Sequence, residues 1–122
     1  MAEISYDVLG IGNAIVDVLA PAKDAFLKEY GMVKGSMALI DAQKAEELYA
    51  AMGSGTEASG GSAANTVAGV AALGGRACFI GKVRDDQLGR TFSHDIQNIG
   101  VDFPSTPAAG GAPTARCLIA VT

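Results

Sequence analysis

Residues 59–75 have the sequence SGGSAANTVAGVAALGG, a run of small side chains from which the expected fold can be built. A serine ahead of an alanine-rich segment is typical of a helix start, so we expect a helix with Ser62 as its N-cap. Gly74 is the expected stop, because glycine readily takes the left-handed conformation that ends many helices. A helix with such small side chains can pack closely on a sheet.

Gly60 and Gly61 leave the start of this helix without side chains, so a ligand could contact the backbone there directly. The free N–H groups and the positive end of the helix dipole favour an electronegative ligand group. Asn65, one turn into the helix, would face such a ligand. The alternative is that this stretch serves the fold alone and binds no ligand, and the residues are equally consistent with it. An asparagine three residues after a serine imitates a capping box, and small residues allow close packing.

Continuous apolar segments around this helix predict buried strands, and turn and cap residues between them predict further helices. Asp41 is the expected N-cap of one helix, and Pro21 is expected near the start of another. The expected strands span 8–11, 35–41, 76–83, 101–103 and 114–122, the helices 21–31, 42–53, 62–74 and 85–100, with a loop or short strand at 54–59 and an irregular loop at 104–113. Strands that alternate with helices predict parallel pairing and the α/β class.

The last expected helix has a clear buried face. Leu88, Phe92 and Ile96 are spaced four residues apart, which is typical of an amphipathic helix. Asp85 or Asp86 is expected to cap its first turn. The two adjacent carboxylates could instead bind a metal ion, but carboxylates at this place more often act as caps, and we predict no metal site.

Composition excludes several classes of protein. The 122 residues suffice for one domain, and 49% apolar with 18% charged residues indicate a globular chain. A net charge of −4 without a basic stripe argues against nucleic acid as a partner. No apolar segment is long enough for a membrane span, and the acidic N-terminus does not resemble a signal peptide. Cys78 and Cys117 each lie in an apolar run, which suits two reduced, buried thiols in a cytoplasmic protein.

Residues 10–17, GIGNAIVD, begin inside the first expected strand and continue past its C-terminal end. A dinucleotide-binding fingerprint needs a glycine where Ile15 stands, so this stretch is not one. In open α/β sheets, ligands bind beyond the carboxyl ends of strands. Asn13 and Asp17 at such an end could hydrogen-bond the hydroxyls of a sugar or polyol. A turn-forming asparagine and a turn or cap aspartate are the alternative, which these residues alone favour.

Three stretches, GIGNAIVD, GGSAANTVAGVAALGG and FIGKVRDDQLGR, resemble in order and spacing the N-terminal part of the ribokinase-like, or PfkB, family of carbohydrate and nucleoside kinases. GMVKGSMALID and TARCLIAVT are most similar to its adenosine-kinase branch. The chain departs from the family at Arg84, where glycine is usual, and at Val67, where a smaller residue is usual. The resemblance implies the N-terminal part of a ribokinase-like fold, with a central, mostly parallel sheet flanked by helices and a small β lid.

Family members carry a second signature near the C-terminus, which contains the catalytic base and an anion hole, and their ATP site lies in the same half. Residues 1–122 contain no such signature. The resemblance therefore implies that 1–122 is a single incomplete α/β domain, the substrate-binding half of a kinase, without catalytic or metal-binding residues. The catalytic base, ATP and Mg²⁺ are expected to lie beyond residue 122, so the chain by itself is expected to be inactive.

The family's sugar contacts fall on the two glycine-containing stretches of this sequence. The resemblance implies that Asp17 holds two ribose hydroxyls, with Asn13 beside it. Gly61, next to Gly60, would offer its backbone N–H to the sugar, and Asn65 would bond a ribose hydroxyl. A carboxylate that accepts two hydrogen bonds suits a vicinal diol.

The resemblance also implies lid strands near 33–40 and 101–122, which would close over the substrate and exclude water. Met37, Leu39 and Cys117 would then face the substrate, although ordinary core packing explains them equally well. A homodimer through the lid is a further implication.

The expected function is therefore the substrate-binding and lid portion of an ATP-dependent kinase. Its substrate would be a small-molecule nucleoside or sugar, phosphorylated on a primary hydroxyl, with adenosine as the first candidate. A non-catalytic nucleoside- or sugar-binding module is the alternative. A purely structural α/β unit, in which the glycines serve packing alone, is the third interpretation.

Overall fold

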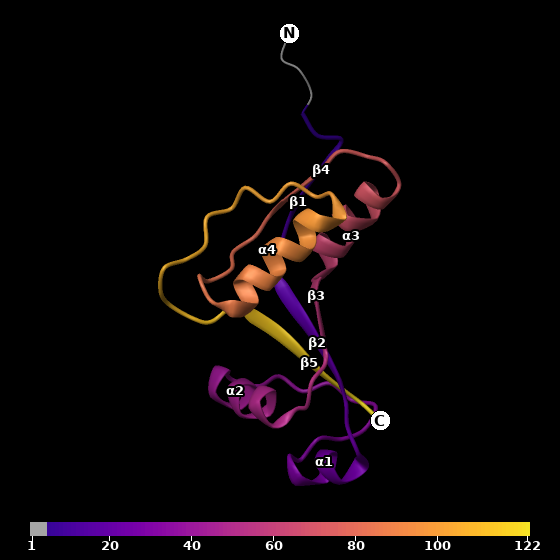
Figure 1. The fold of residues 1–122 in the computed structure, drawn as a ribbon, viewed down its shortest axis with the longest axis vertical. Coiled ribbons are helices and arrows are strands. Elements are labelled where there is room, and N and C mark those ends of the chain that lie inside the picture. Colours follow the sequence, from indigo (N-terminus) through magenta and orange to yellow (C-terminus); the bar gives the residue numbers. More distant parts are fainter. Residues whose placement is uncertain (1–4) are drawn as a thin grey trace.

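The computed structural model describes residues 5–122 (Figure 1). The expected domain is 1–122, and its first four residues lie outside the described part. The described elements are, in chain order, β1 (Val8–Ile11), β2 (Ile15–Pro21), α1 (Asp24–Glu29), α2 (Ala42–Ala51), β3 (Thr56–Gly60), α3 (Ser62–Ala72), β4 (Ala77–Ile80), α4 (Gln87–Ile99) and β5 (Ala115–Val121). Along the long axis, β1, β4, α3 and α4 occupy one end and α1 and α2 the other, while β2, β3 and β5 run between them.

The described strands form two sheets. β1 pairs with β4 in parallel, from Val8 opposite Ala77 to Ile11 opposite Ile80. The second sheet has the order β3–β2–β5, in which β2 is antiparallel to β3 and parallel to β5. The α/β class is confirmed, and the pairing is mostly but not wholly parallel. The stretch left open as a loop or short strand is the antiparallel strand β3.

β2 corrects the expectation of a turn after the first strand. The chain leaves the first sheet at Gly12, whose N–H donates to the carbonyl of Ile80 over 3.1 Å. It then enters the second sheet, where Val16, Val18 and Ala20 are buried while their neighbours are partly or fully exposed. This alternation is the signature of a strand with one covered face, and it is hard to see in the sequence because apolar residues stand at partly or fully exposed positions as well as at buried ones.

Pro21 ends β2 and does not begin a helix, so the expected helix at 21–31 is shorter. α1 starts at Asp24, after the chain has left the sheet. Proline has no N–H to donate to a ladder, and the end of a strand tolerates it as well as a helix start does.

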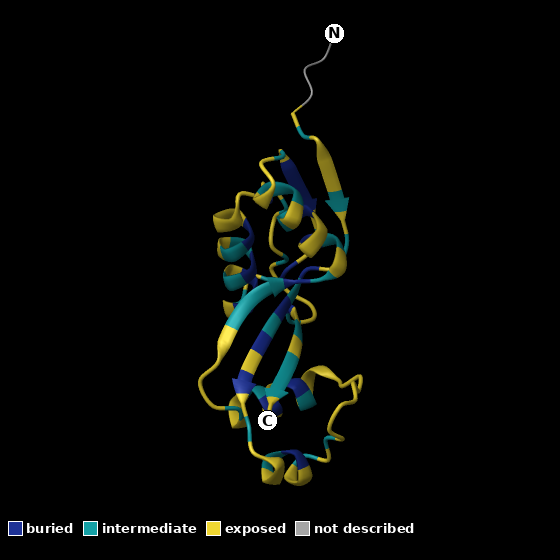
Figure 2. Ribbon diagram, turned by 90° about the vertical axis from the view of Figure 1, so that its right-hand side faces the viewer, coloured by how far each residue is buried: buried dark blue, intermediate teal, exposed yellow. Residues whose placement is uncertain are grey.

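The core lies between the helices α3 and α4 and the strands that they cover. Phe79 of β4 and Phe92 of α4 are 5.8 Å apart between ring centroids, and Phe103 lies 5.2 Å from Phe92. Leu88, Phe92 and Ile96 are buried, which confirms the predicted face of α4. β4 is buried at three of its four residues, whereas β1 is largely exposed (Figure 2).

The helix caps are confirmed at two positions and corrected at a third. The carboxylates of Asp41 and Asp86 accept hydrogen bonds from the first turns of α2 and α4. α3, however, has Gly61 as its N-cap, and Ser62 is its first helical residue with no side-chain cap bond. The chain turns there with a φ of +100°, a conformation that glycine adopts and serine does not favour.

The segment 33–40 contains no strand, so the strand expected at 35–41 is wrong, whereas the part of this segment in a lid stays a prediction. This segment pairs with no described strand, and an isolated apolar strand does not persist in water. In the other segment, 101–122, β5 is present, but 101–103 contributes only a single bridge between Asp102 and Cys78. Cys78 is buried as expected, whereas Cys117 is exposed on β5.

Candidate functional site

Asp17 lies in the middle of β2, with a strand paired on each side. Its register partners are Ala58 in β3 and Cys117 in β5. Paired residues point to the same face of a sheet, so these three residues form one row, which we call the Asp17 row. Val16 and Val18 are buried on the opposite face, which leaves the Asp17 row on the open face. Asp17 therefore lies within the second strand and not in a turn after the first.

The Asp17 side chain lies against the backbone at the start of α3. A β-carbon on Gly60 would lie 2.5 Å from Asp17 Oδ2, and one on Gly61 would lie 2.5 Å from the carbonyl oxygen of Asn13. A side chain at Gly61 would meet backbone and would need a strained φ, so the packing requires glycine there, whereas a side chain at Gly60 would displace the Asp17 carboxylate. The same close approach brings Asp17 and Asn13 to the start of α3.

Asn65 lies in the first turn of α3, where its N–H donates to the carbonyl of Gly61 over 2.8 Å. Its side chain and that of Asn13 are exposed, whereas Asp17 is half-buried. In the described part of the chain, these three side chains have no hydrogen bond or ion pair. Their hydrogen-bonding groups are therefore available to a ligand. The predicted residues that meet around this helix start are Asn13, Asp17, Gly60, Gly61 and Asn65.

Cys117 is the member of the Asp17 row that comes from β5. The family resemblance predicts that this residue faces the substrate. Partial burial raises the pKa of its thiol, and the negative charge of Asp17 raises it further. The thiol is consequently protonated at neutral pH and is a poor nucleophile. Its position beside Asp17 suits a contact surface more than a reactive group.

Met37 and Leu39 are not brought to the Asp17 row. They lie in the strand-free segment between α1 and α2, with exposed fractions of 79% and 93%. Side chains this exposed contact almost nothing, so their predicted role in facing the substrate stays a prediction. The alternative of ordinary core packing is wrong for both residues.

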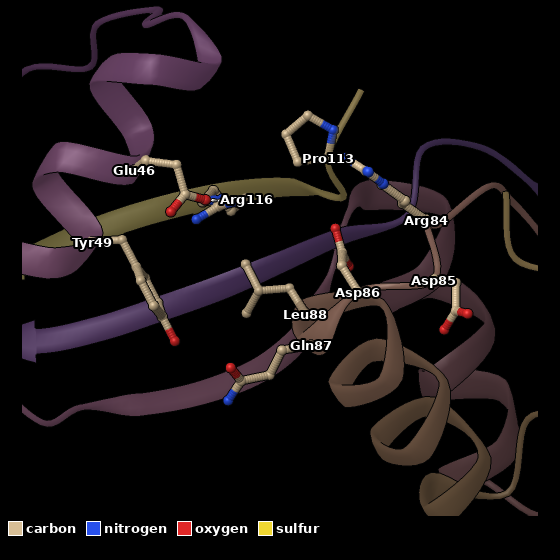
Figure 3. Close-up of a pocket in the computed structure, with 9 residues that line it drawn as sticks. All are labelled: Glu46, Tyr49, Arg84, Asp85, Asp86, Gln87, Leu88, Pro113 and Arg116. Carbon is tan, nitrogen blue, oxygen red and sulfur yellow. Dashed lines mark hydrogen bonds and ion pairs between the residues drawn. The ribbon is translucent and has the colours of Figure 1, made fainter. Parts of the chain in front are cut away.

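A cavity of about 370 Å³ lies between α2, the start of β5 and the N-terminus of α4 (Figure 3). Arg116, which lines it, is next to Cys117 on β5, so the two side chains point to opposite faces of the sheet. The cavity is therefore separate from the Asp17 row. Its lining residues are Glu46, Tyr49, Arg84, Asp85, Asp86, Gln87, Leu88, Pro113 and Arg116.

Arg116 joins α2 to the sheet inside this cavity. Its guanidinium donates to Glu46 over 2.7 Å and lies 5.4 Å from the centre of the Tyr49 ring. The Tyr49 hydroxyl donates in turn to Glu57 of β3, and this hydrogen bond raises the pKa of Tyr49. The Arg116 side chain is 9% exposed, so its charge is paired and largely withdrawn from solvent.

Asp86 does more than cap α4, and this is what sequence reasoning missed. Its carboxylate accepts from the N–H of Gly89 at 2.8 Å, from the N–H of Thr114 at 3.0 Å and from the Thr114 hydroxyl at 2.6 Å. Burial alone would raise the pKa of Asp86, but the hydrogen bonds from Thr114 and Gly89, with the charge of Arg116, lower it overall. No local pattern reveals a partner that lies 28 residues away.

Residues 5–122 contain neither a candidate membrane span nor a cluster of metal ligands. No helix there is long and apolar enough to cross a membrane. No three histidine, cysteine, aspartate or glutamate side chains gather there in a way that could hold a metal ion.

The model of the pfkB family carbohydrate kinases matches residues 29–122, which include β3, α3 and the whole of α4 and β5. The chain belongs to the pfkB family. Within this family it is 59% identical to the adenosine kinase from Sinorhizobium meliloti, over 94% of this chain, with a TM-score of 0.79. It is 52% identical to a probable sugar kinase from Rhizobium etli, over 93% of this chain, with a TM-score of 0.76.

A curated relative in the pfkB family, fructokinase-1 from rice (Oryza sativa subsp. japonica), is 40% identical over 63 residues, which are 52% of this chain and 20% of that protein. The chain covers 35% of the Sinorhizobium adenosine kinase and 34% of the Rhizobium sugar kinase. It therefore spans about a third of these solved relatives. The likeness confirms the ribokinase-like fold of the matched part.

Proposed function

We propose that the chain is the substrate-binding and lid portion of an ATP-dependent kinase that phosphorylates a primary hydroxyl of a nucleoside or sugar. The observation that carries this proposal is the half-buried Asp17 carboxylate, which lies against Gly60 without a partner in the described residues. A partly buried carboxylate without hydrogen bonds costs free energy, and a bound ligand would supply them. Membership of a carbohydrate kinase family supports a sugar as that ligand.

The groups around the start of α3 suit a ribose or a similar polyol. The two oxygens of Asp17 can accept one hydrogen bond from each of two vicinal hydroxyls. The N–H of Gly61 can donate to a sugar oxygen, and the Asn65 amide can both donate and accept. A deoxy analogue would leave one of these groups unpaired, so we expect the site to reject it strongly.

Adenosine is the first substrate to test. The 59% identity to an adenosine kinase extends over 94% of this chain, whereas the 40% identity to rice fructokinase-1 extends over 63 residues. Fructose is accordingly the second candidate. Cys117 on the open face of β5 would contact the part of the substrate that lies above the sugar.

The chain's residues would bind and orient the acceptor, and the sheet β3–β2–β5 would serve as the lid that excludes water. ATP with Mg²⁺ supplies the phosphoryl group in this family of reactions, and we place both, with the catalytic base, outside residues 1–122. The chain alone would then have no kinase activity. A cytoplasmic location and a homodimer through the lid stay predictions.

The proposal is tested by calorimetric titration of the whole protein with adenosine and with fructose, using Asp17→Ala and Asp17→Asn. Losing a carboxylate that holds two hydroxyls should weaken binding by about 100-fold or more, since hydrogen bonds to charged groups contribute roughly 1.5–3 kcal/mol each. Asp24→Ala is the matched control, because Asp24 is an exposed carboxylate paired with Lys34 on the far end of the molecule. Unchanged affinity in both Asp17 variants would refute the assignment.

An ATP-dependent phosphorylation assay separates the kinase from the non-catalytic binding module. A kinase converts adenosine or fructose to its phosphate when ATP and Mg²⁺ are added to the whole protein. Tight binding with no phosphorylated product would favour the binding module. Robust activity of residues 1–122 alone would contradict the division of roles proposed for this chain.

A further inference from the structure

α4 carries a carboxylate that reaches the edge of the sheet next to the glycine pair. Asp95 Oδ2 accepts a hydrogen bond from the N–H of Ser59 over 2.7 Å, between residues 36 apart in the chain. Ser59 is in β3, one residue before Gly60, and β3 is an edge strand of the described sheet. Edge strands carry N–H groups that no neighbouring strand can bond. Asp95 therefore fixes one of them immediately before the place where Asp17 meets Gly60.

The N-cap of the same helix holds the strand on the other side of Asp17. Asp86 accepts both the N–H and the hydroxyl of Thr114, the residue directly before β5. Thr114 is 4% exposed, and its hydroxyl oxygen also accepts the N–H of Arg84 over 3.0 Å. The loop before Thr114 is irregular and mostly exposed from 104 to 113, so this buried junction is where β5 becomes anchored.

These two anchors determine which side chains surround Asp17. A strand that slips by one residue turns every side chain to the other face of the sheet. A slip of β5 would replace Cys117 with Arg116 beside Asp17, and a slip of β3 would move Gly60 away from the carboxylate. α4 is a rigid support for both strands, because Phe92 and Ile96 on its inner face have no exposed surface.

We propose that Asp86 and Asp95 are positioning residues for the sugar site at Asp17, which they hold from both sides without touching the sugar. Asp95 sets the position of Gly60 and Gly61 through β3, and Asp86 sets the register of β5 through Thr114. This inference rests on the proposed function. A displacement of about 1 Å in a site of this kind can cost two orders of magnitude in rate, so hydrogen bonds outside the site can govern it.

A merely structural role would give a different result. Part-buried hydrogen bonds to carboxylates stabilise any fold, so their loss lowers the melting temperature whatever the site does. A positioning role additionally weakens the affinity of the molecules that remain folded. Measurements well below the melting temperature of each variant therefore separate the two roles.

The experiment measures the Kd of adenosine by calorimetry on the whole protein, with the melting temperature of each variant recorded. Asp95→Ala removes the hydrogen bond to the Ser59 N–H, and Thr114→Val removes the hydroxyl bond to Asp86 while the backbone N–H bond remains. Each variant should raise Kd by about tenfold or more. Asp95→Asn and Thr114→Ser keep an acceptor and a hydroxyl, and should stay within roughly threefold of the wild type.

Two controls complete the set. Asp85→Ala removes an exposed ion pair to Arg90 at the start of the same helix, and Ile96→Val lowers stability inside the core. Both should leave Kd unchanged. Amide hydrogen exchange without ligand is a second measurement, in which Gly60 and Gly61 should exchange faster in Asp95→Ala than in Ile96→Val.

The outcomes distinguish this inference from the proposed function. A wild-type protein that binds neither adenosine nor fructose refutes the proposed function, and the positioning role falls with it. A wild-type protein that binds adenosine, with Asp95→Ala and Thr114→Val binding equally well, refutes the positioning role alone. A rise in Kd for Ile96→Val equal to that for Asp95→Ala would show that general stability, and not positioning, governs the site.

Discussion

The Asp17 carboxylate lies so close to the Cα of Gly60 that a β-carbon on Gly60 would be 2.5 Å from Asp17 Oδ2. Real β-carbons do not approach other atoms so closely, so the carboxylate occupies the space that a side chain would need. The glycine therefore fixes where the carboxylate can lie. It connects the middle of β2 to the start of α3 without any hydrogen bond between the two residues.

Gly60→Ala should displace the Asp17 carboxylate and weaken adenosine binding to the whole protein by about tenfold or more. Stability should fall by roughly 1–3 kcal/mol, as for other side chains forced into filled space. Gly69→Ala is the matched control, because a β-carbon at Gly69 meets nothing within 4 Å. In the interior of α3 it should raise stability by about 0.5–1 kcal/mol and leave the affinity unchanged. Equal affinities for the two variants would show that the contact with Gly60 does not position Asp17.

The reactivity of Cys117 should report the charge of its neighbour. Because partial burial and then Asp17 raise the pKa of the Cys117 thiol, little thiolate is present near neutral pH and alkylation by iodoacetamide should be slow. Asp17→Asn removes the negative charge and should accelerate alkylation of Cys117 roughly two- to fivefold, the effect of a charge interaction worth up to about 1 kcal/mol. Mass spectrometry of the two cysteine-containing peptides measures both rates.

Cys78 provides the internal control for this measurement. It is 3% exposed and should stay unmodified as long as the protein is folded. An alkylation rate at Cys117 that does not change in Asp17→Asn, while Cys78 stays protected, would contradict an electrostatic influence of Asp17 on the thiol.

Local patterns predicted the parts of the fold that depend on neighbouring residues in the chain. The buried face of α4 follows from the spacing of Leu88, Phe92 and Ile96, and the caps at Asp41 and Asp86 follow from single carboxylates before helical segments. Both signals act within one or two helical turns. The convergence of the two glycine-containing stretches on one helix start was anticipated only through the family resemblance.

Distant contacts account for what sequence reasoning missed. Gly61, not Ser62, is the N-cap of α3, and the carbonyl of Asn13, in the connection between β1 and β2, occupies the space where a side chain at position 61 would lie. The division between β1 and β2 depends on which sheet each half joins, and that choice is made by strands far away in the sequence. Thr114 gave no signal, because its two bonds to Asp86 join residues 28 apart.

Acid should remove the stabilisation that Asp86 gives to α4 and β5. The pKa of Asp86 is lowered in the folded protein, so its contribution to stability is complete above the unfolded value of 3.8 and is lost as the pH falls through the lower folded value. Asp86→Asn keeps a good N-cap but loses the charge, and should cost about 1–2 kcal/mol at pH 7. Urea denaturation of both proteins between pH 7 and pH 3 should show this difference constant above about pH 5 and shrinking below about pH 4. Asp85→Asn, which alters an exposed ion pair, should change stability by less than about 1 kcal/mol. A difference between wild type and Asp86→Asn that persists undiminished at pH 3 would mean that the ionised carboxylate is not its source.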